Sequence, residues 1–330
     1  MNRVRTFGLA IAFLGALGVL AVRSDRVHAQ AIGVQAMRDA HEARAMEVAL
    51  AAARSPRAEL RANAIEALQH RATAAQPVVM MAVDDPSAAV RFAALVTGGK
   101  LKLPAIEGPA RRRVGDPNLS VRAAALFALR QVEPGTQISP LAQLMSQPDP
   151  GVRANVAMLL GMMGDASAAP MIKELSQLPM PRASEVRAAL MRVQVAEAVA
   201  TLGDDLALDA IRSAMYSTFD EVRVLAVLTL GRLKDKRMEP ALVKMLAEPP
   251  VELQLAAAEA LARTGNTRGL DVVLGATAHA LPTVRMQAAF ALRWFGDPRA
   301  TEHLVKLLED PEEAVRLAAA AVILAPAAGQ

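Results

Sequence analysis

Few residues in this chain are of a type and spacing that could do chemistry. After residue 29 the histidines are widely separated: His41, His70, His279 and His303. His41-Glu42 lacks the second histidine, four residues after the first, that a zinc-protease helix requires. Gly98-Gly99-Lys100 lacks the first glycine of a phosphate-binding loop and is interpreted as a helix stop.

The remaining routes to catalysis are also poorly supported by the sequence. The chain has no cysteine, which excludes disulfides, thiolate metal sites and a cysteine nucleophile. No set of serine, histidine and aspartate stands out either. We therefore expect a protein that is not an enzyme and that has no catalytic residue, no metal and no cofactor.

The N-terminal segment, 1–29, has the pattern of a secretory signal peptide. Arg3 and Arg5 precede an uncharged apolar run over residues 7–22, and Val27-His28-Ala29 offers β-branched and small residues to a signal peptidase. The run is short for a bilayer span, which needs about 20 residues. We predict cleavage after Ala29 and a periplasmic or secreted location. The alternative is an uncleaved segment that anchors the protein to a membrane.

The rest of the chain is nearly neutral. The predicted signal peptide holds four arginines and one aspartate, so residues 30–330 keep 33 of the 37 basic and 32 of the 33 acidic side chains. Their signs are interspersed, whereas phosphate-binding proteins rely on clustered lysine and arginine. We expect no nucleic-acid partner.

An apolar residue followed by arginine recurs along most of the chain. The successive spacings are 30, 31, 31, 39, 31, 31, 31 and 31, if Leu253-Gln254 is included as one copy. The second residue of each copy is called the anchor here. The anchors are Arg61, Arg91, Arg122, Arg153, Arg192, Arg223, Gln254, Arg285 and Arg316. Positions one before, three after and seven after the anchor are mostly apolar and share one helix face, which predicts an amphipathic helix.

A shorter apolar segment precedes each anchor helix, so each unit is predicted to be helix, turn, helix. Asp-Pro steps such as Asp310-Pro311 separate the two segments, and glycines such as Gly164, Gly203, Gly265 and Gly296 stop the second one. A single unit cannot bury its apolar face alone, so the units must stack. The sequence predicts an all-α solenoid, or superhelix, of about nine two-helix repeats over residues 50–330, after a helical lead-in over residues 30–49.

In this pattern the chain resembles HEAT repeats, specifically the short bacterial type also called phycobilisome-lyase HEAT-like repeats. The resemblance covers roughly residues 50–325. It implies a protein-binding scaffold with a concave helical surface. Deoxyhypusine hydroxylase is a HEAT-like enzyme that holds iron with several His-Glu pairs, of which only His41-Glu42 has a counterpart here. That activity is not expected, and no pigment site of a phycobilin lyase can be identified.

The anchor arginines are interpreted as structural residues. They lie among apolar positions, and a buried guanidinium requires an acid or carbonyl groups as partners. An acid stands six residues before several anchors. The resemblance implies an aspartate–arginine ladder between units, formed by Arg91, Arg122, Arg153, Arg192, Arg223, Arg285, Arg316, Asp85, Asp116 and Asp310. The alternative role for these arginines is substrate binding.

The polar side of each anchor helix, which usually lines the concave surface of HEAT proteins, is the candidate binding surface. It comprises the positions two, five and nine residues after the anchor. The candidate binding residues are Phe127, Met158, Met162, Gln194, Glu197, Arg232, Glu259, Arg263, Phe290 and Trp294. Large apolar groups on a solvated stripe are candidate contact anchors. The alternative is that neighbouring repeats cover them.

The one long spacing between anchors, from Arg153 to Arg192, marks an insertion near residues 177–186. It contains Pro179 and Pro181, and Ser184-Glu185 is a suitable helix start, so we predict a longer second helix or a projecting loop. Taken together, the sequence predicts an exported scaffold that binds an unidentified protein or peptide on its concave surface. Two alternatives remain: a non-catalytic subunit or lyase-type module of an enzyme complex, and a structural envelope protein.

Overall fold

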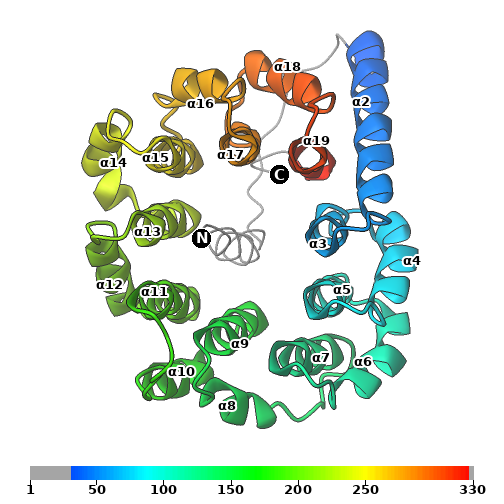
Figure 1. Ribbon diagram of the computed structural model, residues 1–330, viewed down its shortest axis with the longest axis vertical. Coiled ribbons are helices and arrows are strands. Elements are labelled where there is room, and N and C mark those ends of the chain that lie inside the picture. Colours follow the sequence, from blue (N-terminus) through cyan, green and yellow to red (C-terminus); the bar gives the residue numbers. More distant parts are fainter. Residues whose placement is uncertain (1–30, 327–330) are drawn as a thin grey trace.

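The computed structural model describes residues 31–326, so the predicted signal peptide lies outside the described residues. Within this range the chain forms eighteen α-helices and three short 3-10 helices, and it forms no strand. The α-helices make nine consecutive pairs, each with one outer and one inner helix (Figure 1). The all-α prediction and the predicted number of repeats are confirmed.

The outer helices are α2 (Ala31–Ala52), α4 (Ala72–Ala82), α6 (Glu107–Arg113), α8 (Pro140–Met145), α10 (Ala169–Ser176), α12 (Leu206–Ala214), α14 (Glu239–Met245), α16 (Leu270–Ala276) and α18 (Pro298–Leu307). The inner helices are α3 (Ala58–Ala67), α5 (Ala88–Lys100), α7 (Leu119–Val132), α9 (Pro150–Met163), α11 (Glu185–Thr201), α13 (Asp220–Arg232), α15 (Val251–Arg263), α17 (Pro282–Leu292) and α19 (Glu313–Leu324). The 3-10 helices are η2 (Pro104–Ile106), η3 (Ala166–Ala168) and η4 (Lys236–Met238).

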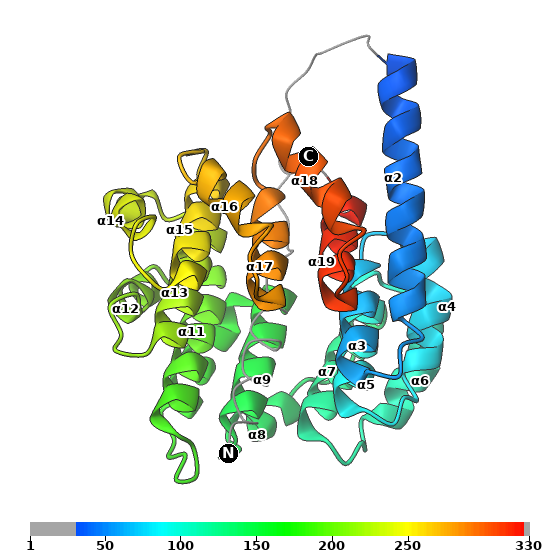
Figure 2. The same ribbon diagram turned by 45° about the horizontal axis from the view of Figure 1, so that its top comes forward.

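The array of repeats closes into a ring. Each inner helix packs against the inner helix of the next pair, and the last one, α19, packs against α2 and α3 of the first pair. In the turned view, α2 runs beside α19 and α3 and extends beyond the rest of the ring (Figure 2). The boundary expected at residue 49 was wrong, because it falls inside α2 and this helix is the outer member of the first pair.

The contact of α2 and α3 with α19 and with the turn before it is called the seam here. Polar groups supplement its apolar packing: Arg44 Nε lies 3.1 Å from Glu309 Oε1, and Arg71 Nε donates to the carbonyl of Leu324 at 3.1 Å. Arg71 also pairs with Glu42 of α2 at 2.7 Å. Three of the seven buried residues of α19 are alanines, which lets its axis approach its neighbours closely.

The ladder is present and runs from one repeat to the next. Both Nε and Nη2 of Arg91 donate to the carboxylate of Asp116 at 2.8 Å, and Nη1 donates to the carbonyls of Asp85 and Pro86. Asp116 stands six residues before the following anchor. Arg61 pairs in the same way with Asp85, and Arg285 pairs with Asp310. Each of these carboxylates therefore joins two consecutive repeats.

Other ladder positions depart from this pattern because the acid is missing or exposed. Gln147 stands where Arg122 would meet an acid, and Arg122 donates to the carbonyl of Asp116 instead. Arg316 donates to the carbonyls of its own turn. Arg223 pairs with Glu248, whose side chain is 46% exposed.

The assignment of Arg192 to the ladder was wrong, because Arg192 is exposed. Ser217 occupies the acid position that would face Arg192 from the next repeat, so a buried guanidinium there would have no carboxylate partner. Arg192 keeps its charge in water instead.

Arg153 is fully buried and is held by carbonyl groups alone. It donates to the carbonyl oxygens of Gln147 and Leu178 at 2.5 Å and of Pro179 at 3.2 Å. Two of these carbonyls belong to the predicted insertion, which forms a loop before α11. Ser184 caps that helix, which is longer than the other inner helices, as expected. Burial lowers the pKa of the Arg153 guanidinium.

The turn eleven residues after an anchor adopts a left-handed backbone in several repeats. Gly164, Gly203 and Gly265 have φ of 74°, 98° and 93°, which confirms these three stop signals. Lys102 and Lys234 take the same conformation without glycine, at φ 48° and 54°. Gly296 does not adopt the left-handed backbone. It also does not stop α17, since that helix already ends at Leu292.

The interpretation of Gly98-Gly99-Lys100 as a stop was wrong for the glycines, which lie inside α5. A Cβ atom on Gly99 would come within 2.9 Å of the Cα atom of Ala128. The glycine therefore permits close packing of α5 against α7.

Candidate functional site

The inner helices enclose a cavity of about 270 Å³, which is called the lumen cavity here. Its lining comes from α3 and α5 on one side and from α13, α15, α17 and α19 on the other. Helices that are far apart in the sequence thus contribute to one site because the ring closes (Figure 1). In an open superhelix, α3 and α15 would lie far apart.

Two ion pairs lie along the α11–α13–α15 wall of the ring. Arg232 donates from Nε and Nη2 to the two carboxylate oxygens of Glu197 at 2.5 and 2.6 Å. Arg263 Nε donates to Glu259 Oε1 at 2.9 Å, one helical turn away. Glu259 is only 5% exposed, and its Oε2 atom is buried without a hydrogen-bond partner.

Trp294, the only tryptophan of the chain, follows α17 and lies close to two arginines. The guanidinium carbon of Arg263 is 3.8 Å from the centroid of its ring, and that of Arg293 is 5.3 Å away. Both distances fall within the range of a cation–π interaction. Burial, together with the charge of Arg263, lowers the pKa of Arg293 to about 10. Arg293 remains protonated at neutral pH.

The opposite side of the cavity carries a glutamate and a lysine. Burial raises the pKa of Glu66 on α3 to about 7, although the charge of Lys100 on α5 opposes this shift. Burial also lowers the pKa of Lys100, whose Nζ donates to Gln69 Oε1 at 2.9 Å. His70 is exposed and does not line the cavity, and partial desolvation with the charges of Arg293, Lys100 and Arg71 lowers its pKa.

A sequence model of HEAT repeats matches residues 110–193 and 239–325, just over half of the chain. The chain belongs to the HEAT-repeat family. No curated protein is similar enough in sequence to count as a relative. The family resemblance inferred from the anchor pattern is confirmed.

Several solved structures are similar to this chain at low sequence identity. Human deoxyhypusine hydroxylase is 18% identical, over 76% of this chain and 94% of its own, with a TM-score of 0.36. The CpcE–CpcF complex of phycocyanin lyase from Nostoc sp. PCC7120 is 19% identical, over 82% of this chain and 91% of the matched chain, with a TM-score of 0.33. Kap121p is 14% identical over 86% of this chain, with a TM-score of 0.35. The match covers only 38% of the length of Kap121p. At these TM-scores none of the three bears on function.

The HEAT ring brings half of the predicted binding residues to the lumen cavity. Those that line it are Arg232, Glu259, Arg263, Phe290 and Trp294, and Glu197 is bonded to Arg232. Their role in binding stays a prediction. Sequence reasoning missed Glu66, Lys100 and Arg293, which also line the cavity. Glu66 and Lys100 occupy positions five and nine after their anchors, so the rule applied to the other repeats would have found them.

The remaining predicted binding residues lie elsewhere. Phe127 is 2% exposed and packs against the space left by Gly99 of α5, so its assignment as a contact residue was wrong. The alternative, that a neighbouring repeat covers it, is correct for this residue. Met158 and Met162 on α9 are half-buried and pack against the core. Gln194 on α11 is half-buried and is not among the residues that line the lumen cavity.

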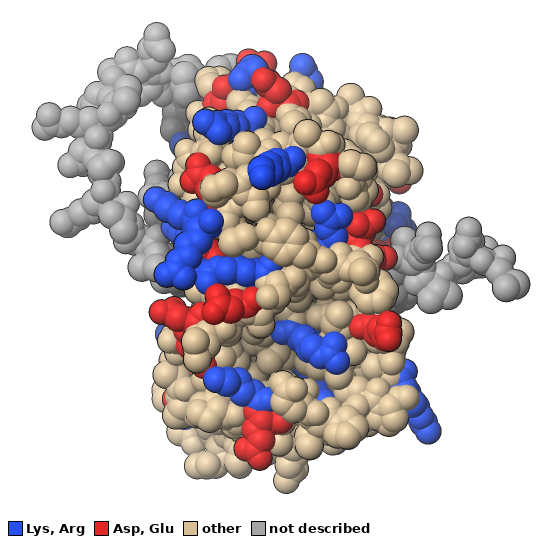
Figure 3. Space-filling view, turned by 90° about the vertical axis from the view of Figure 1, so that its left-hand side faces the viewer, with Lys and Arg blue, Asp and Glu red and all other residues tan. Residues whose placement is uncertain are grey.

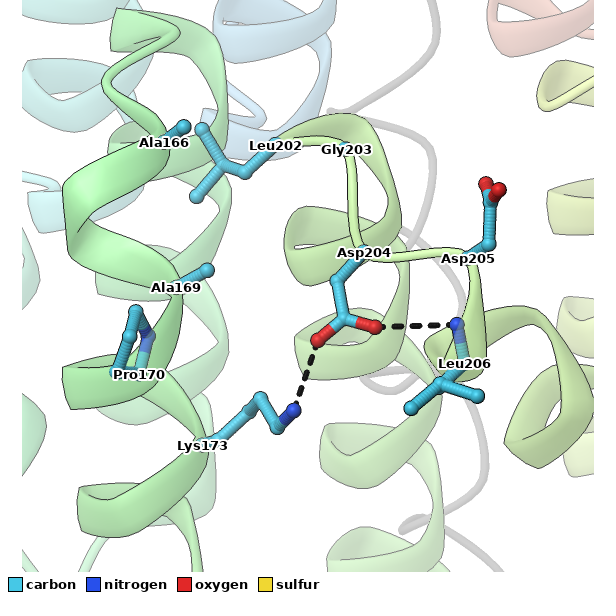
Figure 4. A pocket seen from close by; sticks show the side chains of 9 residues that line it. All are labelled: Ala166, Ala169, Pro170, Lys173, Leu202, Gly203, Asp204, Asp205 and Leu206. Atoms are coloured by element: carbon cyan, nitrogen blue, oxygen red, sulfur yellow. Dashed lines mark hydrogen bonds and ion pairs between the residues drawn. The ribbon is translucent and has the colours of Figure 1, made fainter.

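A second, wider depression lies on the outside of the ring, between α10 and the turn before α12 (Figure 4). Its volume is about 710 Å³. Lys173 Nζ lies 2.7 Å from Asp204 Oδ2, and Asp204 Oδ1 accepts the backbone N–H of Leu206 at 3.0 Å. Asp205 points away from these groups. Because its central charges already satisfy each other, this depression is a weaker candidate than the lumen cavity.

The outer face over α12 and α14 carries basic and acidic side chains close together (Figure 3). This face has no broad field of one sign. Within residues 31–326, no helix is both long enough and apolar enough to cross a bilayer. The same part of the chain contains no group of three or more histidine, aspartate or glutamate side chains that could hold a metal ion.

Proposed function

We propose that this HEAT-repeat protein is an exported, non-catalytic binding protein whose lumen cavity holds a narrow segment of a protein partner. The observation that supports this most is the convergence of charged and aromatic side chains from five inner helices on one cavity. Desolvating so many charged groups is costly unless they serve recognition or are paired. Several of these groups are only partly paired.

The size of the cavity limits what it can take. Its volume of about 270 Å³ is just below the range of about 300–1,000 Å³ that is typical of small-molecule pockets. It therefore admits one or two side chains and the backbone between them. The repeat pattern predicted a protein or peptide partner on the concave surface, and we propose that this partner contacts the narrow lumen cavity rather than the whole length of that surface.

The ring supports this role because it needs little ordering on binding. Each inner helix is fixed by a neighbour on both sides, so few degrees of freedom are lost when a peptide enters. The N-terminal pattern over residues 1–29 supports export, with cleavage after Ala29. Periplasmic fractionation and N-terminal sequencing of the purified protein would test export.

Site-directed photo-crosslinking tests the site. A photo-reactive amino acid replaces Thr283, an exposed residue that lines the lumen cavity, or Leu206, which is 75% exposed on the outside of the ring. The proposal expects a protein partner crosslinked from position 283 and identified by mass spectrometry. Crosslinks from position 206 alone would contradict it and would favour a subunit that docks by its outer surface.

A further inference from the structure

The lumen cavity carries an arginine whose charge has no acid paired with it. On the same wall, Arg232 pairs with Glu197 and Arg263 pairs with Glu259. Among the described residues Arg293 forms no ion pair, and the one hydrogen bond that its guanidinium donates goes from Nη2 to the carbonyl of Pro326 at 3.2 Å. This wall therefore has one positive charge in excess, which favours an anionic ligand.

The geometry of Arg293 indicates the kind of anion. Its Nε atom is buried and has no hydrogen-bond partner, and burying an unpaired donor is unfavourable. Nε and Nη2 form the edge of a guanidinium that binds a carboxylate through two parallel hydrogen bonds. One position of this edge is empty and the other holds only a neutral carbonyl. A carboxylate would satisfy both.

A second unpaired atom lies on the neighbouring helix. Glu259 Oε2 is a buried acceptor in a side chain that is only 6% exposed, and Glu259 lines the cavity. An N–H group of a ligand would satisfy this acceptor. Next to α17, Leu317, Ala318 and Ala321 of α19 give the cavity an apolar wall. The lining is thus complementary to a ligand that carries a carboxylate, an N–H group and an apolar group.

We propose that the lumen cavity binds a carboxylate-bearing peptide residue, with its carboxylate on Arg293, its N–H on Glu259 Oε2 and its apolar neighbour against α19. This inference rests on the proposed function, since it names the chemistry of the peptide segment. The carboxylate comes either from the C-terminus of the partner or from an acidic side chain. Lys100 on the opposite side adds to the attraction for an anion when Glu66 beside it, whose pKa is about 7, is protonated.

Trp294 provides the readout because it is the only tryptophan and is stacked under Arg263. The chain from residue 30 to residue 330 is titrated with three acetylated tripeptides: Ala-Ala-Leu with a free carboxylate, the same sequence as an amide, and Ala-Asp-Leu as an amide. The inference expects a saturable fluorescence change with at least one carboxylate peptide and none with the neutral amide. Which of the two carboxylate peptides binds identifies the source.

Two substitutions test whether the carboxylate of the peptide binds to Arg293. Arg293→Gln should weaken binding by about ten- to a hundredfold, the usual loss for a hydrogen bond to a charged group. Arg293→Lys keeps the positive charge but loses the pair of parallel N–H donors, so it should give an intermediate affinity. The control, Arg299→Gln, changes an exposed arginine on the outside of the ring and should leave binding unchanged. Circular dichroism verifies that each variant is folded.

Equal affinity for the neutral amide, or no response to either carboxylate peptide at millimolar concentration, would overturn the inference. These outcomes are separable from failure of the proposed function. If carboxylate peptides fail but position 283 still crosslinks a protein, the lumen binds a partner by other chemistry. If position 283 captures no partner, the proposed function itself fails.

Discussion

Replacing Arg91 with alanine tests whether the ladder stabilises the ring. The side chains of Arg91 and Asp116 are only 10% and 0% exposed, and Arg91 joins two repeats through its bonds to Asp116, Asp85 and Pro86. Arg91→Ala leaves the Asp116 carboxylate buried with a weaker partner, Arg113, at 3.4 Å. Breaking one side of a buried ion pair typically costs about 3–5 kcal/mol, and we expect a loss of that size.

Arg223→Ala is the matched control. Arg223 occupies the same anchor position, but its partner Glu248 is 46% exposed and lies 3.1 Å away. An exposed pair contributes about 1 kcal/mol or less, so this variant should lose much less stability. The sequence alone would assign both arginines the same cost, and the difference comes from the exposure of their partners.

Urea denaturation at pH 7, followed by circular dichroism, measures both losses. Because repeat arrays can unfold in parts, hydrogen exchange of α5 and α7 should accompany it. The double variant with Arg91→Met and Asp116→Leu should lose less than Arg91→Ala, since no charge is left unpaired. Equal losses for Arg91→Ala and Arg223→Ala, or a loss below about 1 kcal/mol for the former, would refute the reasoning.

Three other residues allow further tests. Burial raises the pKa of Glu66 from 4.5 to about 7, so between these pH values the folded protein retains a proton that the unfolded chain has released. The stability should therefore fall as pH rises from 4.5 to about 7. Glu66→Gln should flatten this part of a curve of Tm against pH. A Cβ on Gly231 would lie 2.6 Å from the Cα of Ala260, so Gly231→Ala should cost about 1–3 kcal/mol in urea denaturation, whereas Gly108→Ala, with open space around it, should cost nothing. Lys234→Gly should raise the unfolding free energy by about 1 kcal/mol, because Lys234 adopts a left-handed backbone at φ 54°; an unchanged midpoint would show that this turn is not strained.

The repeat pattern predicted the helices well because their causes are local. Apolar positions at helical spacing, glycines in left-handed turns and Ser184 as a helix cap each act within one repeat. Closure of the ring could not be predicted in this way. It depends on a small rotation per repeat summed over nine pairs, and on a contact between α2 and α19, which lie at opposite ends of the described chain.

The candidate site was predictable in part for the same reason. The rule of positions five and nine found Arg232, Glu259, Arg263 and Trp294, since helix geometry fixes the inner face. It could not reveal that Arg293, eight residues after its anchor, lacks an acid. It also could not separate Phe127 from the lining residues, because the glycine that covers its ring belongs to another helix.

Crosslinking across the seam tests closure of the ring most directly. The chain has no cysteine, so Arg44→Cys with Glu309→Cys introduces the only two thiols, at positions whose native side chains lie 3.1 Å apart. A short bis-maleimide should join them within one folded chain, whereas Arg44→Cys with Lys173→Cys, on the far side of the ring, should not be joined. A folded monomer in which positions 44 and 309 stay unlinked would show an open array and would contradict the account.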